Sequence, residues 1–343
     1  QDAAEAVRWY REAAEHGHAG GHLHLGMMYT MGQGVTQNAA EAVRWFRKAA
    51  EQGHALGQVN LGVAYANGQG VAQDAAEAVR WYRKAADQGD AGAQFNLGGM
   101  YANGQGVAQD AAEAVRWYRK AADQGLADAQ FNLGWMHDNG QSDTQNGAEA
   151  VRWYRKAAEQ GHANAQYYLG LMYAQGQGVT QDADEAVRWF HKAAEQGHAA
   201  AQSNLGAAFA KGQGTTQDAA EAMRWFRKAA EQGLAAAQTN LGAAYARGQN
   251  AAKAAHWYRK AAEQGDARGQ FNLGVVYANG EGIAKNEAEA IRWYRKAAEQ
   301  GNANAQFNLA GRYANGQGVA KDAVEAVRWY RKEIGRASCR ERV

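Results

Sequence analysis

Residues 73–108 read QDAAEAVRWYRKAADQGDAGAQFNLGGMYANGQGVA, and near-copies of this stretch fill almost all of the 343-residue chain. Its tryptophan recurs every 36 residues, with a single shorter step of 32 residues between Trp225 and Trp257. The ten positions are Trp9, Trp45, Trp81, Trp117, Trp153, Trp189, Trp225, Trp257, Trp293 and Trp329. A fixed period of this size indicates units that bury their apolar faces only against their neighbours. The sequence therefore predicts one solenoid domain over residues 1–332, with nine full units and the first helix of a tenth.

Each unit predicts two helices. Asp74 and Glu77 have the spacing of a capping box, which indicates a first helix over about residues 75–88. Its apolar residues recur on one face, and Trp81 lies at the border of that face. A second helix is expected over about residues 91–103, and it is apolar almost all round. We therefore expect the second helix to be buried between its own first helix and the next unit.

Composition supports an all-α class. The chain has no proline, and its 42 glycines recur at fixed points in each period, as expected for helices that end at glycine. Small residues such as Ala93 and Gly98 permit close helix contact, so a bulkier residue at Gly98 is expected to overpack the interface by about 1–3 kcal/mol. The net charge of +2, from 37 basic and 35 acidic residues, provides no bulk attraction to nucleic acid or anionic lipid. No stretch approaches the ~20 apolar residues of a membrane span.

The repeated motif A-x-x-W-[YF]-x-x-A-A-x-x-G, followed by A-Q-x-x-L-G-x-x-Y-x-x-G-x-G-V, resembles the Sel1-like repeat, a relative of the tetratricopeptide repeat. The resemblance covers residues 1–332 and implies a right-handed superhelix of antiparallel helix pairs. The close similarity of the copies to one another is typical of bacterial members. It also implies a scaffold for protein–protein contacts. A cysteine-rich branch of this family carries a disulfide in each unit and is associated with penicillin binding. This chain has a single cysteine, which argues against that branch.

Two places depart from the repeat. In the fourth unit His137 and Asp138 replace the usual tyrosine and alanine, and Ser142 and Asp143 stand where glycine and valine are usual, so we expect local loosening. The connection over residues 247–250 lacks four residues that the other units have. We expect a tighter turn and a kink there, with the stacking retained.

The repeat stops at Lys332, where Ala-Ala-Glu-Gln-Gly is due. The eleven residues 333–343 correspond to the translation of a common short-read sequencing adapter, and we interpret them as an artefact. The chain's single cysteine, Cys339, lies in this tail. We expect a frayed terminus here, and a natural protein that extends beyond both ends of the sequence. Its location stays open, because bacterial cytoplasm and an exported site both fit.

Signals for catalysis or cofactor binding are weak, so we predict a chain that is not an enzyme and has no cofactor. The serines lack the G-x-S-x-G and S-x-x-K contexts, and the G-x-G turns follow helices where a phosphate loop would follow a strand. His18 and His22 have an i, i+4 spacing that can hold a transition metal. We favour replacement of glutamine and asparagine by histidine, and predict no metal site.

The predicted function is a non-enzymatic scaffold for a protein or peptide partner. A basic stripe on the first helices is the candidate site for an acidic or carboxylate-ended peptide, although much of it can be a solvated face with i, i+3 ion pairs. The residues are Arg80, Lys84, Arg116, Lys120, Arg152 and Lys156. The alternative is a carbohydrate- or small-ligand-binding solenoid, in which the tryptophan ladder stacks on sugar rings.

Overall fold

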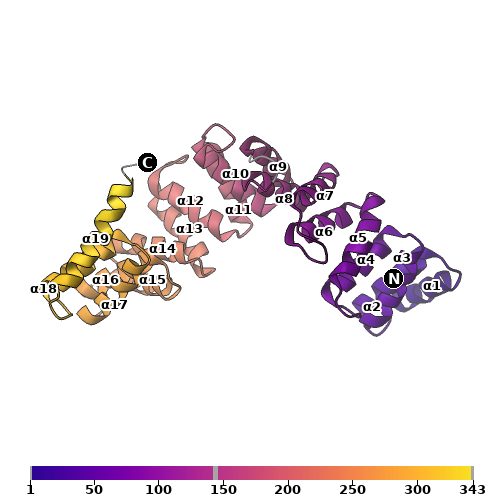
Figure 1. Cartoon of the computed structure of the whole chain (residues 1–343), viewed down its shortest axis with the longest axis horizontal. Coiled ribbons are helices and arrows are strands. Elements are labelled where there is room, and N and C mark those ends of the chain that lie inside the picture. Colours follow the sequence, from indigo (N-terminus) through magenta and orange to yellow (C-terminus); the bar gives the residue numbers. More distant parts are fainter. Residues whose placement is uncertain (1, 142–145, 341–343) are drawn as a thin grey trace. The chain divides into compact units, whose positions relative to one another are not determined.

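A computed structural model describes residues 2–141 and 146–340, with side chains to Glu333. It contains 19 helices, and its described residues contain no strand. The first helices of the repeats are α1 (Ala3–Glu15), α3 (Ala39–Glu51), α5 (Ala75–Asp87), α7 (Ala111–Asp123), α9 (Gly147–Glu159), α11 (Ala183–Glu195), α13 (Ala219–Glu231), α15 (Ala251–Glu263), α17 (Glu287–Glu299) and α19 (Ala323–Arg340). The second helices are α2 (Ala19–Met31), α4 (Ala55–Asn67), α6 (Ala91–Asn103), α8 (Ala127–Asp138), α10 (Ala163–Gln175), α12 (Ala199–Lys211), α14 (Ala235–Arg247), α16 (Ala267–Asn279) and α18 (Ala303–Asn315). The predicted all-α class and helix pairs are confirmed (Figure 1).

The chain forms two compact units, residues 1–181 and 182–343. Within each unit, a first helix packs on its own second helix, and that second helix packs on the first helix of the following repeat. Second helices are therefore enclosed on two sides, as their apolar sequence predicts. Among the described residues, no helix combines the length and apolarity needed to cross a membrane.

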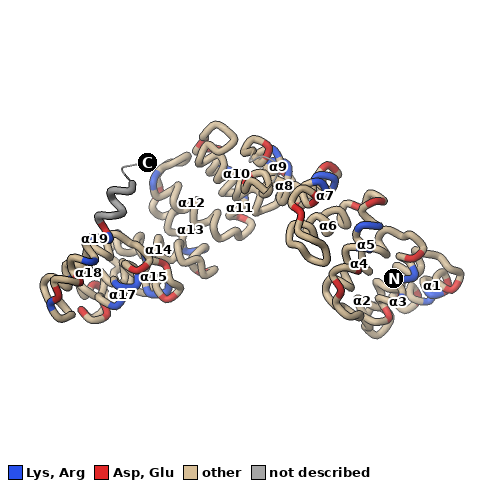
Figure 2. The backbone as a smooth tube through the Cα atoms, in the orientation of Figure 1, with Lys and Arg blue, Asp and Glu red and all other residues tan. Residues whose placement is uncertain are grey.

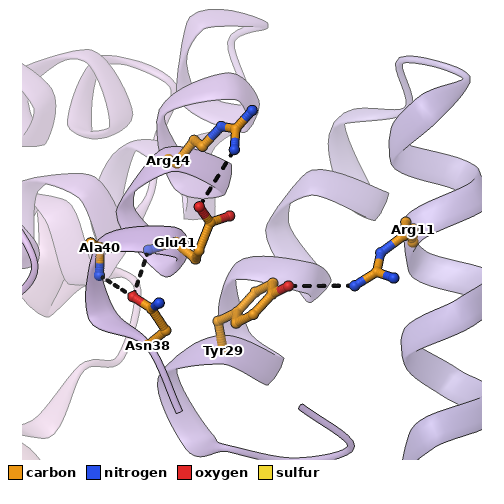
Figure 3. Close-up of polar contacts among 6 residues, drawn as sticks. All are labelled: Arg11, Tyr29, Asn38, Ala40, Glu41 and Arg44. Atoms are coloured by element: carbon orange, nitrogen blue, oxygen red, sulfur yellow. Dashed lines mark hydrogen bonds and ion pairs between the residues drawn. The ribbon is translucent and has the colours of Figure 1, made fainter. Parts of the chain in front are cut away.

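Side chains fix where the helices begin. The Asp74 carboxylate accepts hydrogen bonds from the backbone N–H groups of Ala76 and Glu77, both at 3.0 Å. Figure 3 shows the same cap in the preceding repeat, where Asn38 Oδ1 accepts from two backbone amides at 3.1 Å each. These bonds satisfy amide donors that have no partner within the helix. The second helices end differently: α6 ends at Gly104, whose φ of +65° favours glycine.

The repeat tryptophans are core residues. Trp81 is 5% exposed and packs in one cluster with Phe46 and Leu61 of the preceding repeat. Trp153 likewise packs with residues of the preceding repeat. Trp9 has no preceding repeat in this sequence to pack on, and it is 62% exposed. Trp81 lies at the border of its own helix, and the preceding repeat makes it part of the inter-repeat core.

Glycines in the second helices admit an aromatic ring from the next repeat. A Cβ added at Gly98 would lie 2.8 Å from Cδ1 of Tyr118 and 3.1 Å from its Cγ. Gly62 has the same relation to Tyr82, and Gly134 to Tyr154. The close approach expected at Gly98 is therefore present.

A glutamine ladder, to which the sequence analysis gave no role, joins consecutive repeats. Gln94 is 4% exposed, and its side-chain amide donates to the carbonyl of Ala86 at 3.2 Å. Its Oε1 accepts a bond from Nε2 of Gln124, in the next repeat, at 2.8 Å. Equivalent pairs are Gln58–Gln88, Gln130–Gln160, Gln202–Gln232, Gln238–Gln264 and Gln270–Gln300. Each buried amide thus has hydrogen-bond partners in two repeats. Because these bonds are made, burial of the polar group costs little folding free energy.

Both irregular places retain helix pairing. In the short connection Gln249 adopts φ +58°, and Asn250 caps α15 by accepting from a backbone amide at 3.2 Å. Helices α14 and α15 still pack, as expected. In the fourth repeat His137 is buried, and its Nε2 lies 3.4 Å from Arg119. Residues 142–145, where loosening is expected, lie outside the described residues.

The end of the chain differs from expectation. Helix α19 continues through Gly335 to Arg340, so the helix does not end where the repeat stops. The expected fraying of this terminus stays a prediction. The interpretation of residues 333–343 as an artefact stays a prediction. Oε1 of Gln306 is buried and has no hydrogen-bond partner among the described residues. In most of the ladder pairs this partner is a glutamine 30 residues later, which corresponds to position 336.

Candidate interaction surface

The arginines of the basic stripe lie on first helices of the first unit and pair with glutamates. Arg80 lies 3.1 Å from Glu77 across one helical turn, and its side chain is 57% exposed. Arg116 and Arg152 form the same pair with Glu113 and Glu149, at 2.8 and 3.3 Å. Exposed pairs of this kind contribute only a few tenths of a kcal/mol. The arginine charges are therefore largely balanced by their own helices, and the expected i, i+3 pairing is present.

The lysines of the stripe are held differently. The ammonium nitrogens of Lys84, Lys120 and Lys156 lie 4.2, 4.2 and 4.1 Å from the ring centroids of the tryptophans three positions before them. A cation over an indole face is attracted by the ring quadrupole, by about 0.5–1 kcal/mol at an exposed site. Within the part of the chain with described side chains, none of these three lysines has a carboxylate within ion-pair distance. Each of these three repeats therefore presents one positive charge held over an indole ring.

The lysine–tryptophan arrangement recurs along the chain. Lys48 lies 4.3 Å from the ring of Trp45, and Lys192 lies 4.1 Å from that of Trp189. Figure 2 shows the blue and red segments mainly on first helices and in turns, whereas α4, α6 and α10 contain no charged residue. The first-helix face is thus the charged side of a repeat.

A second set of arginines, which the sequence analysis did not single out, ties the two helices of a repeat together. Arg47 donates to the hydroxyl of Tyr65, 18 residues later, at 2.7 Å. Figure 3 shows the equivalent bond in the first repeat, where Arg11 lies 3.4 Å from the Tyr29 hydroxyl. In the sixth repeat the arginine and the tyrosine are both replaced, by His191 and Phe209. These arginines have a structural partner and are not part of the candidate stripe.

The exposed tryptophan platform needed for the carbohydrate alternative is absent from the described residues. Seven of the ten repeat tryptophans are buried, and their largest exposed fraction is 8%. The seven are Trp81, Trp117, Trp153, Trp189, Trp225, Trp293 and Trp329. The indole faces that would stack on sugars are instead packed in the core and covered by lysine. The exposed tryptophan ladder that this alternative assumed was therefore wrong.

The histidines near the start of the chain have separate local partners. His18 accepts a hydrogen bond from a backbone amide at the start of α2, at 3.4 Å. His22 is buried in a glutamine-ladder position and lies 3.4 Å from Gln52. His24 stacks on Tyr10, with ring centroids 4.8 Å apart. No group of three or more metal-ligating side chains occurs within the described ranges. The i, i+4 spacing of His18 and His22 therefore does not bring a ligand set together here.

The fold and its repeated surface define an α-solenoid of tandem helix pairs, a class in which neighbouring repeats form one extended binding surface. A family model described as the Sel1 repeat matches residues 1–18, 20–54, 55–90, 91–126, 127–162, 163–198, 199–234, 235–266, 267–302 and 303–332. The chain belongs to the Sel1 repeat family.

Two solved structures support this assignment. The chain is similar to c5321, a protective antigen of uropathogenic Escherichia coli strains with an SLR fold, at 39% identity and a TM-score of 0.83. That match covers 95% of this chain and 79% of the other. A Sel1 repeat protein from Oxalobacter formigenes matches at 35% identity and a TM-score of 0.68, over 91% of this chain and 93% of the other. The comparison with curated proteins gave no match.

Proposed function

We propose that this chain is a non-enzymatic interaction scaffold whose first-helix face holds an acidic segment of a protein partner. Sel1 repeat solenoids typically serve as protein-interaction scaffolds. Our proposal adds that the first-helix face is the surface that binds the partner. The observation that carries it is the row of lysines at positions 84, 120 and 156, each held over a buried indole without a carboxylate partner among the described residues. A side chain that is already ordered loses less conformational entropy on binding.

The two kinds of basic residue have different roles in this proposal. Lys84, Lys120 and Lys156 supply charge that is available to a partner. Arg80, Arg116 and Arg152 must exchange a glutamate for the partner's carboxylate, so their net contribution is smaller. The stripe therefore favours acidic segments by long-range attraction, which salt weakens.

Charge reversal tests the proposal. A fluorescein-labelled glutamate-rich peptide is the probe, and its affinity is measured by fluorescence anisotropy over a series of salt concentrations. The variant K84E/K120E/K156E is expected to weaken binding at least about tenfold, with a smaller salt dependence. The control K211E/R268E/K321E changes the net charge equally at exposed residues outside the stripe. An equal loss of affinity in both variants would mean that only the net charge of the chain matters, which would contradict the proposal.

A further inference from the structure

A cavity of about 400 Å³ lies between the first two repeats. Its walls come from α2, α3, α4 and the turn that follows α4. Lysine, arginine, aspartate and glutamate are absent from its lining, which is mainly apolar. Met27 and Met31 at its rim are 38% and 51% exposed. Its volume is in the range of small-molecule pockets, about 300–1,000 Å³, and methionine adapts its shape to different ligands.

Comparison with other repeats shows which group this cavity lacks. Phe46 lines it and occupies the position that is tyrosine in the third, fourth and fifth repeats. In the fourth repeat the side chain of Asn132 interacts with the hydroxyl of that tyrosine, Tyr118, and partly offsets the rise in its pKa that burial causes. The same hydroxyl lies 3.5 Å from where a Cβ on Gly99 would be. By repeat register, Asn132 corresponds to Asn60 and Gly99 to Met27, and both of these line the cavity.

The amide of Asn60 is therefore placed where a phenolic hydroxyl would meet it. In another repeat Asn308 interacts in the same way with the hydroxyl of Tyr294, whose pKa burial raises, so an asparagine faces a phenol again. In the second repeat the ring at position 46 has no hydroxyl. The structure gives the Asn60 side chain no hydrogen bond among the described residues, and this side chain is partly exposed to the cavity.

We propose that this cavity binds a free, uncharged phenolic molecule, whose hydroxyl pairs with Asn60 and whose apolar body packs against Phe46, Val43 and the two rim methionines. A phenol is neutral at physiological pH, since its ordinary pKa is about 10. Neutrality suits a lining without charged residues, where an ion would be costly to desolvate. This site is separate from the basic stripe, so it does not depend on the proposed scaffold function.

Binding of 4-propylphenol to the full chain tests the proposal. Methionines labelled with ¹³C at the methyl group report the location by NMR, and Met27 and Met31 are expected to show saturable shifts. The ether 4-propylanisole, which cannot donate, is the matched ligand and is expected to bind three- to tenfold more weakly. N60A is expected to lose affinity for the phenol by a similar factor.

The variant F46Y is the sharpest test, because it installs the side chain that other repeats already accommodate beside an equivalent glycine. Its hydroxyl is expected to occupy Asn60 and to weaken binding of 4-propylphenol at least about tenfold without loss of helix content. The matched change F226Y, in the second unit, leaves this cavity intact and should retain the wild-type affinity. Unchanged affinity in F46Y, or no shift of Met27 and Met31 up to the solubility limit of the phenol, would overturn the proposal. Tighter binding of N-acetyltyrosinamide than of 4-propylphenol would overturn the assignment to a free molecule. It would indicate that the cavity binds a tyrosine side chain of a protein partner.

Discussion

Two adjacent glycines in α6 allow a test of how repeats are held together. A methyl group at Gly98 would lie 2.8, 2.9 and 3.1 Å from three ring atoms of Tyr118. A methyl group at Gly99 would have the Tyr118 hydroxyl at 3.5 Å as its nearest neighbour, which is an ordinary contact. Tyr118 is 5% exposed, so its ring has little room to move.

The two substitutions share one contribution to the free energy of unfolding and differ in a second. Each replaces glycine by alanine inside a helix, which stabilises the folded state by about 1 kcal/mol. G98A also overpacks the interface between repeats, at a cost of about 1–3 kcal/mol. The helix term cancels in the difference, so G98A is expected to be less stable than G99A by about 1–3 kcal/mol, and G99A is expected to exceed the wild type.

Urea unfolding followed by circular dichroism measures both variants. Because stacked repeats can unfold in parts, hydrogen exchange of α6 and α7 is needed as a local measure. In the double variant G98A/Y118L the smaller side chain removes the clash, so the two substitutions are expected to be less destabilising together than their separate effects predict. Equal stabilisation by G98A and G99A would refute the argument that ring contact at Gly98 fixes the spacing of the repeats.

Two further predictions concern the ends of the array. Burial, with a smaller effect of the Lys48 charge, lowers the pKa of His22 from its ordinary value of 6.5, so the unfolded chain binds a proton first and stability should fall as the pH drops below about 6.5. H22Q, which restores the ladder residue of other repeats, should reduce this pH dependence in urea unfolding, and an unchanged pH profile would contradict the assignment. Replacing residues 333–336 by Ala-Ala-Glu-Gln, as the repeat would have it, should give Gln306 a partner and slow hydrogen exchange in α18; faster or equal exchange would show that the repeat register does not extend past Lys332.

The sequence alone determined the period and the helix pairs, and the expected ranges 75–88 and 91–103 match α5 and α6 to within one residue. These depend on local signals, such as Asp74 before a helix and Gly104 after one, and on apolar spacing that repeats without interruption. The i, i+3 pairs on the first helices also follow from spacing along a single helix, since Arg80 can reach Glu77 without help from any other element.

The tertiary structure decided which partners lie across the repeat boundaries. Trp81 stands at the edge of its own helical face, and only the preceding repeat buries it. In the sequence, Gln94 is a polar residue in an apolar helix without an evident partner. The structure supplies the partner, because Nε2 of Gln124 in the next repeat lies 2.8 Å from its Oε1. The hydroxyl that Phe46 lacks matters only because Asn60 lies in the same cavity wall. A helix pattern records which side of a residue is apolar, whereas its partner depends on how the next repeat packs against it.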